Sequence, residues 1–168
     1  MPPRSVVLIG FMASGKTAVG RALAQRLGYE FCDTDEMVTA DAGRPVEQIF
    51  EEEGEDGFRA RERDAVVRAA ARPSRVIACG GGAILSVRNY GVLKGAGPIC
   101  YLRTSADELI GRLGNGAGRP LLHGDPSEAV PRLLTERAPA YETAADLVVD
   151  TDGRAPDEVA ADIVERLP

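Results

Sequence analysis

The sequence predicts an α/β fold in which helices cover both faces of a parallel sheet. Five short apolar runs are bounded by turn residues, and segments with helix-compatible patterns separate them. Strands that alternate with helices indicate βαβ crossovers, and such crossovers join parallel strands. A glycine-containing loop between the first apolar run and the first helical segment fits the same class.

The expected strands are short apolar runs, as is typical of strands buried on both faces. In chain order they are Val6–Ile9, Tyr29–Cys32, Val76–Cys79, Ile99–Leu102 and Leu147–Val149. The expected helices fill the stretches between and after them: Lys16–Leu27, Glu36–Ala42, Val46–Glu53, Phe58–Ala71, Ala106–Leu113, Ser127–Thr143 and Pro156–Leu167. No repeat, linker or low-complexity tract divides the chain, so we expect one domain over residues 1–168.

Composition and charge narrow the class of protein. The chain is 44% hydrophobic and 27% charged, and its net charge of −6 argues against wholesale nucleic-acid binding. Its apolar stretches are far too short to span a membrane and no secretory signal opens it, so we expect a cytoplasmic protein. The three cysteines (Cys32, Cys79 and Cys100) share no CxxC spacing and are interpreted as buried hydrophobic side chains.

The octapeptide GFMASGKT, residues 10–17, matches the pattern G-x-x-x-x-G-K-[ST] of the phosphate-binding P-loop. Gly10 and Gly15 let the backbone curl so that its N–H groups point at phosphate oxygens, and the following helix adds its positive N-terminus. Lys16 supplies a compact charge to the outer phosphates, and Thr17 offers a hydroxyl to Mg²⁺. Of the 20 basic residues only two are lysines. Lysine is kept here because the rigid fork of an arginine does not fit inside a ring of backbone amides.

The rest of the sequence selects among P-loop proteins. A signalling GTPase needs an N-K-x-D motif, and no asparagine precedes either lysine. A large motor or transporter ATPase does not fit a chain of 168 residues. Small kinases and small ATP-dependent binding modules remain. Ala13 stands where many small-molecule kinases carry another glycine, and we expect its methyl group to be tolerated while it stiffens the loop.

Two carboxylates, Asp33 and Asp35, follow the second expected strand. Ligands collect outside the carboxyl ends of parallel strands, and side chains two apart in an extended segment point the same way. One carboxylate could reach the Mg²⁺ shell, and the other could accept a hydrogen bond from a substrate hydroxyl. Such pairs also cap helices, and Asp35, just before Glu36, is a candidate N-cap.

Two further motifs lie near the expected ligand site. Arg59 and Glu62 are three residues apart on one helical face, so Glu62 could hold the guanidinium in place. Taken alone, the pair fits a solvated charged helix better. The triplet Gly80–Gly82 follows the third strand and indicates close approach of the backbone to a ligand, with a plain flexible turn as the alternative.

Over essentially its whole length the chain resembles the shikimate kinase family. The motifs that carry the resemblance, in the family's order, are GFMASGKT (10–17), DTD (33–35), FRARE (58–62), GGG (80–82), GRPLL (118–122), ERAPAY (136–141) and VDTDGRAP (149–156). The resemblance implies a three-layer α/β/α P-loop kinase with a central five-stranded parallel sheet. It also implies a substrate-binding region at about residues 33–62 and a mobile lid at about residues 111–124.

The resemblance further implies the reaction, a transfer of the γ-phosphoryl group of MgATP to the 3-hydroxyl of shikimate on the way to chorismate and the aromatic amino acids. On this basis Asp35 binds the shikimate hydroxyls and is a possible base. Arg59 and Arg137 bind the substrate carboxylate, because planar guanidinium groups match it bidentately. The triplet Gly80, Gly81 and Gly82 contacts the substrate, with Gly81 at its centre.

For the nucleotide, the resemblance implies that Thr17 and Asp33 organise Mg²⁺ and that the lid residue Arg119 reaches the transferring phosphates. Arg112 and Arg154 look similar to the residues that flank adenine. The expected ATP-binding residues are Gly10, Ala13, Ser14, Gly15, Lys16, Thr17, Ala18, Arg112, Arg119 and Arg154. The expected catalytic residues are Lys16, Asp35 and Arg119.

Two other functions remain open on the sequence. A kinase of gluconate or of a nucleoside monophosphate shares the P-loop and a lid, but not the combined DTD, FRxxE, GGG and RAPxY motifs. A catalytically silent module that binds shikimate or a nucleotide would be free to lose residues that this chain keeps. His123, the only histidine, is interpreted as a solvated loop residue, and nothing in the sequence demands more than a monomer.

Overall fold

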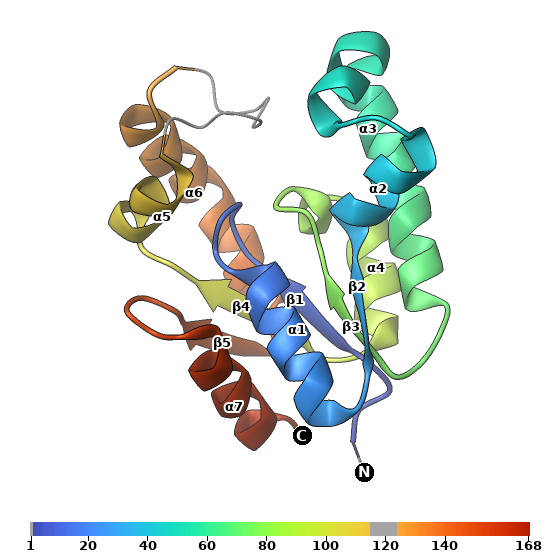
Figure 1. The fold of residues 1–168 in the computed structure, drawn as a ribbon, viewed down its shortest axis with the longest axis vertical. Coiled ribbons are helices and arrows are strands. Elements are labelled where there is room, and N and C mark those ends of the chain that lie inside the picture. The colour runs from blue at the N-terminus through green and yellow to red at the C-terminus, as the bar shows by residue number, and fades with distance from the viewer. Residues whose placement is uncertain (1, 115–123) are drawn as a thin grey trace.

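The structure, a computed structural model, describes residues 2–114 and 124–168, in which five parallel strands form one sheet (Figure 1). The strands are β1 (Val6–Ile9), β2 (Glu30–Asp33), β3 (Arg75–Ala78), β4 (Ile99–Arg103) and β5 (Leu147–Asp150), in the spatial order β2-β3-β1-β4-β5. The central strand β1 pairs with β3 and β4. The predicted parallel sheet is confirmed, and the ends of its strands differ from the prediction by a residue at most.

Helices cover both faces of the sheet. One face is covered by α1 (Lys16–Leu27) and α7 (Pro156–Arg166), and the other by α3 (Val46–Ala70), α4 (Val87–Ala96) and α6 (Pro126–Ala144) (Figure 1). Helix α2 (Thr34–Ala42) packs on α3, α5 (Ala106–Leu113) packs on α6, and a 3-10 turn, Ala83–Leu85, precedes α4. The three-layer α/β/α architecture is confirmed.

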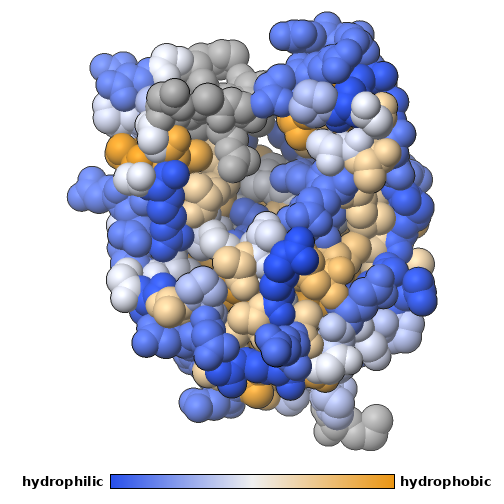
Figure 2. All heavy atoms as spheres, viewed as in Figure 1, coloured by the Kyte–Doolittle hydropathy of each residue, from blue (hydrophilic) through white to orange (hydrophobic). Residues whose placement is uncertain are grey.

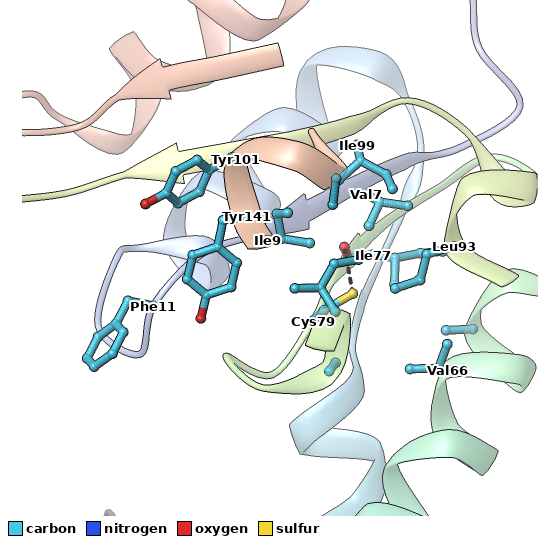
Figure 3. Packing of buried hydrophobic residues seen from close by; sticks show 14 of the residues in the cluster. Val7, Ile9, Phe11, Val66, Ile77, Cys79, Leu93, Ile99, Tyr101 and Tyr141 are labelled. Atoms are coloured by element: carbon cyan, nitrogen blue, oxygen red, sulfur yellow. Dashed lines mark hydrogen bonds between the residues drawn. The ribbon is translucent and has the colours of Figure 1, made fainter. Parts of the chain in front are cut away.

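Alternate residues of each strand enter different halves of the core, because successive side chains of a strand point to opposite faces. Val7 and Ile9 of β1 lie in a cluster with residues of α3, α4 and α6 (Figure 3). Val6 and Leu8 lie in a second cluster with residues of α1 and α7. A third, smaller cluster, which we call the α2–α3 core, lies apart from the sheet and consists of Val38, Ile49, Phe58 and Ala65.

The structure corrects the prediction at two helices. Helix α4 was not predicted, because Gly91 and Gly95 weaken its helical signal; Ser86 caps it by accepting a hydrogen bond from the Asn89 N–H at 3.3 Å. The helices predicted at 46–53 and 58–71 run together as α3, with a kink at Gly54, where φ is 71° and ψ is −179°.

The prediction of buried cysteines is confirmed for Cys79 and Cys100, whereas Cys32 is only half-buried. All three are free thiols. Among the described residues, no helix has both the length and the apolar composition needed to cross a membrane. Hydrophilic side chains dominate the outer surface over α2 and α3 (Figure 2).

Candidate active site

A cleft of about 380 Å³ opens at the carboxyl ends of β1, β2 and β3, where an open parallel sheet binds its ligands. Its walls come from the β1–α1 loop, the end of β2, the glycine triplet and α5. The residues that line it are Met12, Ala13, Gly15, Lys16, Thr17, Ala18, Asp33, Asp35, Cys79, Gly81 and Arg112. The fold therefore brings most of the predicted nucleotide, metal and catalytic residues into one space.

The P-loop wraps around the ammonium group of Lys16. Lys16 Nζ donates hydrogen bonds to the carbonyl oxygens of Gly10 and Phe11 at 2.9 and 2.8 Å, and it lies 3.4 Å from Ser14 Oγ. Gly10 must lack a side chain, because a Cβ atom there would lie 2.9 Å from the carbonyl oxygen of Leu102. The loop thus holds a compact cation at the N-terminus of α1, which favours a bound anion.

Ala13 has a φ of 65°, in the left-handed region that favours glycine. This finding extends the expectation that the methyl group is tolerated, because the backbone at this position carries a conformational cost of about 1 kcal/mol. The Ala13 carbonyl accepts a hydrogen bond from Arg112 Nη1 of α5 at 3.0 Å. The same guanidinium contacts Glu108 at 3.1 Å, so α5 is fastened to the P-loop.

The Asp33 carboxylate accepts hydrogen bonds both from the start of α2 and from Thr17. Its Oδ1 accepts hydrogen bonds from the N–H groups of Asp35 and Glu36 and so caps α2, while its Oδ2 accepts one from Thr17 Oγ1 at 2.9 Å. The prediction that Asp35 is the candidate cap is wrong, because α2 begins at Thr34 and Asp35 lies in its first turn. The two carboxylates nevertheless line the same cleft.

The Thr17 hydroxyl and the Asp33 carboxylate form a small set of hard oxygen donors that suits Mg²⁺. Across the described residues, no group of three histidine, cysteine, aspartate or glutamate side chains could hold a metal ion by itself. Mg²⁺ usually keeps several waters and is held by one or two carboxylates together with substrate phosphates. The donor set therefore fits a magnesium ion that arrives with a nucleotide.

At two positions of the glycine triplet, Gly80 and Gly82, other side chains of the site leave no room for a Cβ atom. A Cβ at Gly80 would lie 2.5 Å from Asp35 Oδ1, and one at Gly82 would lie 2.7 Å from both terminal nitrogens of Arg59. A Cβ at Gly81 would lie 3.3 Å from the backbone N of Met12 in the P-loop and at an ordinary contact distance, 3.5 Å, from Arg137 Nη1. None of the three glycines has a left-handed φ, so the close approach of side chains explains Gly80 and Gly82, while Gly81 is packed tightly against the P-loop backbone.

Arg59 and Glu62 form a partly buried ion pair, with Nη1 and Oε1 2.9 Å apart. Glu62 is 1% exposed, so the interpretation of this pair as a solvated helix face is wrong. Burial raises the pKa of Glu62, although the nearby Arg59 guanidinium opposes this shift. Within the described part of the chain, its second oxygen, Oε2, has no hydrogen-bond partner.

The remaining predicted arginines differ in their surroundings. Arg137 of α6 is buried, 7% exposed, and lies beside Gly81. Arg154 does not line the cleft, since its guanidinium bonds to the Asp150 carbonyl at 2.9 Å and to Asp162 at 3.1 Å. Arg119 and His123, and with them most of the predicted lid, lie outside the described residues.

Sequence reasoning missed two residues that support the triplet. Thr34 is fully buried and its Oγ1 accepts a hydrogen bond from the Gly80 N–H at 3.1 Å. Tyr141 donates its hydroxyl to the Gly81 carbonyl, and burial raises its pKa to about 12, so it stays a neutral donor. Both residues stand inside motifs that carry the family resemblance, DTD for Thr34 and ERAPAY for Tyr141, but the sequence assigned neither of them a role.

The chain was compared with known proteins. The family model for shikimate kinase matches residues 12–168. The shikimate kinase of Symbiobacterium thermophilum is 48% identical in an alignment of 167 residues, and this alignment covers 97% of this chain and 95% of that protein. The one from Salinispora arenicola is 45% identical, with 96% of each chain covered. The solved structure of shikimate kinase from Acinetobacter baumannii in complex with shikimate has a TM-score of 0.93 at 37% identity, and covers 98% of this chain and 92% of that one.

Proposed function

The chain belongs to the shikimate kinase family, and we infer that it is an ATP-dependent kinase that phosphorylates shikimate at its 3-hydroxyl. The observation that carries this inference is the composition of one cleft. A P-loop lysine lines it together with Asp35, and the glycine triplet that closes it contacts Arg59 and Arg137. A site for phosphates beside a site for a hydroxylated carboxylate is what this transfer requires.

We propose that ATP binds along the P-loop, residues 10–17, with its outer phosphates at Lys16. Ser14, Gly15, Thr17 and Ala18 belong to the turn that opens α1, whose backbone N–H groups favour an anion. Arg112 is proposed to flank adenine, a role that its anchorage on the P-loop supports. Arg154 is also proposed to flank adenine, on the family resemblance alone, since its guanidinium bonds to Asp150 and Asp162 and does not line the cleft.

Thr17 and Asp33 are proposed to hold Mg²⁺. The support is their direct hydrogen bond of 2.9 Å, which brings a hydroxyl and a carboxylate together beside Lys16. When bound, the ion neutralises charge on the β- and γ-phosphates.

Shikimate is proposed to bind at the glycine triplet. Arg59 and Arg137 would pair with its carboxylate, since the guanidinium groups meet the triplet from two separate helices, α3 and α6. Asp35 would accept a hydrogen bond from the reacting hydroxyl. Its Oδ1 lies 2.5 Å from the position that a Gly80 Cβ would take, so the missing side chain leaves room for this carboxylate.

In the proposed reaction the 3-hydroxyl oxygen forms a bond to the γ-phosphorus, the bond to the β-γ bridging oxygen breaks, and ADP leaves. Asp35 orients the hydroxyl and takes its proton. Lys16 and Arg119 stabilise the charge of the transferring group.

In nucleotide hydrolases such an arginine is worth about 10³ to 10⁵ in rate, so Arg119→Ala is expected to lose most turnover while shikimate and ATP still bind. An unchanged kcat would remove Arg119 from the mechanism.

The test of this function is ADP release by the purified protein with MgATP, supplied in turn with shikimate, gluconate, CMP and no acceptor. Release that requires shikimate supports the proposal. Release with gluconate or CMP instead would assign the chain to a neighbouring kinase activity and remove the shikimate-site roles. A folded protein that binds ATP without turning over any acceptor would be a silent binding module.

A further inference from the structure

Phe11, in the P-loop, contacts both halves of the cleft. Its carbonyl oxygen accepts hydrogen bonds from Lys16 Nζ at 2.8 Å and from the Ser14 N–H at 3.1 Å. Its ring is buried, 1% exposed, and belongs to the same buried cluster as Tyr141 (Figure 3). Arg137 places its guanidinium carbon 5.6 Å from the centre of the same ring. One residue therefore contacts the phosphate-site lysine through its backbone and a substrate-site arginine through its side chain.

Arg137 is an almost buried cation, 7% exposed. Within residues 2–114 and 124–168, no aspartate or glutamate forms an ion pair with it, although the buried Glu62 carboxylate interacts with it electrostatically. Its direct neighbours include the Phe11 ring, the Gly81 backbone and Tyr141, one turn further along α6. An aromatic face attracts a guanidinium and restricts its position, and the attraction is stronger where water is excluded.

We propose that Phe11 is a positioning residue for the substrate carboxylate. Its ring holds the Arg137 guanidinium against the glycine triplet, in the place where that guanidinium can receive a carboxylate. This proposal rests on the role of Arg137 in shikimate binding. It assigns a substrate-specific task to a residue of the nucleotide-binding loop, where the P-loop pattern itself accepts any side chain.

The competing explanation is that Phe11 only fills the core. Substituting it by leucine or methionine would then lower stability without a selective effect on the substrate carboxylate. Phe31 provides a matched control, because it also stacks on an arginine, with Arg21 4.7 Å from its ring centre. Phe31 lies on the opposite face of the sheet, packed against the α1–α7 side of the core.

The experiment measures binding by calorimetry for the wild type, Phe11→Leu, Phe11→Met and Phe31→Leu. Each protein is titrated with shikimate, with its methyl ester and with ADP, and thermal unfolding reports whether each variant is folded. Both Phe11 variants are expected to weaken shikimate binding by roughly five- to thirtyfold, the range of a buried cation–π contact. They are expected to change the binding of the uncharged ester and of ADP much less. Phe31→Leu is expected to leave all three affinities unchanged.

The results separate the two claims. If folded Phe11 variants bind shikimate as the wild type does, or lose shikimate, its methyl ester and ADP by equal factors, Phe11 does not position Arg137. If the wild type itself does not bind shikimate, the proposed function fails instead. Each Phe11 variant tests the proposal independently, so the test needs only one of the two to fold.

Discussion

At the scale of the residue, Gly82 shows how a single added methyl group would disturb the substrate site. Its φ of −99° and ψ of −4° suit alanine, so a substitution there strains no backbone. The added methyl group would instead meet the Arg59 guanidinium at 2.7 Å and displace it. We expect Gly82→Ala to raise the KM for shikimate by roughly ten- to a hundredfold, the cost of a displacement of about 1 Å in a binding group.

The matched control is Gly91→Ala in α4, where nothing lies within 4 Å of the added Cβ. That variant should leave both KM values unchanged and stabilise the protein by about 0.5–1 kcal/mol, because alanine favours a helix interior over glycine. Steady-state kinetics and thermal unfolding of the two variants check the prediction. A normal KM for shikimate in Gly82→Ala would mean that Arg59 does not bind the substrate from its present position.

At the scale of the element, Asp33 ends β2, caps α2 and hydrogen-bonds Thr17, and two substitutions separate these tasks. Asparagine keeps a good capping oxygen but removes the charge, whereas alanine removes both. We expect Asp33→Ala to lower the free energy of unfolding by about 1 kcal/mol and Asp33→Asn to leave it nearly unchanged. Both variants should need a higher Mg²⁺ concentration for half-maximal activity.

Urea unfolding and a Mg²⁺ titration of the rate measure these two effects separately. Thr39→Ala, further along α2, is a suitable control because its hydroxyl bonds only to carbonyls of the same helix. An unchanged Mg²⁺ requirement in Asp33→Asn would limit Asp33 to the helix cap and remove it from the metal site.

On the scale of the whole molecule, two carboxylates fasten the edge strand β5 to its neighbour. Asp150 pairs with Arg103 of β4, 2.6 Å apart, and this hydrogen bond lowers its pKa. Asp146 accepts a hydrogen bond from Lys94 and another from the Ile99 N–H at 2.9 Å. Burial alone would raise the pKa of Asp146, but these hydrogen bonds outweigh it and the net shift is downward.

A carboxyl whose pKa is lower in the folded state adds stability above its unfolded pKa, and that stability is lost as the pH falls through the folded pKa. The pKa values of both carboxyls lie below the ordinary aspartate value of 3.8, so their contribution to stability should be complete at pH 6–8 and fade below about pH 4. We therefore expect Asp146→Asn and Asp150→Asn to lower Tm at pH 7, and the difference from the wild type to shrink as the pH falls below about 4. Asp56→Asn, at an exposed position on α3, is the control. A Tm difference that stays constant with pH would contradict this account.

The parts of the molecule that follow from local chemistry could be predicted from the sequence. The P-loop needs a fixed spacing and a strand–helix context, and the apolar runs of the parallel strands stand out from their surroundings. The burial of Glu62 could not be predicted, because it stands in a run of charged residues of which Arg63 and Asp64 are exposed, and only the packing of α3 toward the cleft distinguishes it. Helix α4 was missed for a related reason, since Leu93, which packs it into the core, stands in a short segment interrupted by Gly91 and Gly95 and carrying the charged Lys94.

The role of the glycine triplet could be predicted only in part. The sequence indicated a close approach to the backbone, but not that Asp35, Arg59 and Arg137 are the groups that approach. These three residues lie on α2, α3 and α6, and only the fold brings them together.

The separate α2–α3 core has a consequence for how firmly the two sides of the cleft are held. Asp35 and Arg59 lie on α2 and α3, and the α2–α3 core that holds these two helices together contains four buried residues. The P-loop, in contrast, follows β1, a strand that is buried on both faces of the sheet. Amide protons of α2 and of the first half of α3 should therefore exchange with deuterated solvent through local opening, much faster than those of β1. Added shikimate should slow their exchange and leave β1 unaffected, since a ligand stabilises the units that it joins. If α2 exchanged as slowly as β1 without ligand, the protein would open as one cooperative unit. The α2–α3 side of the cleft would then be rigid before shikimate binds.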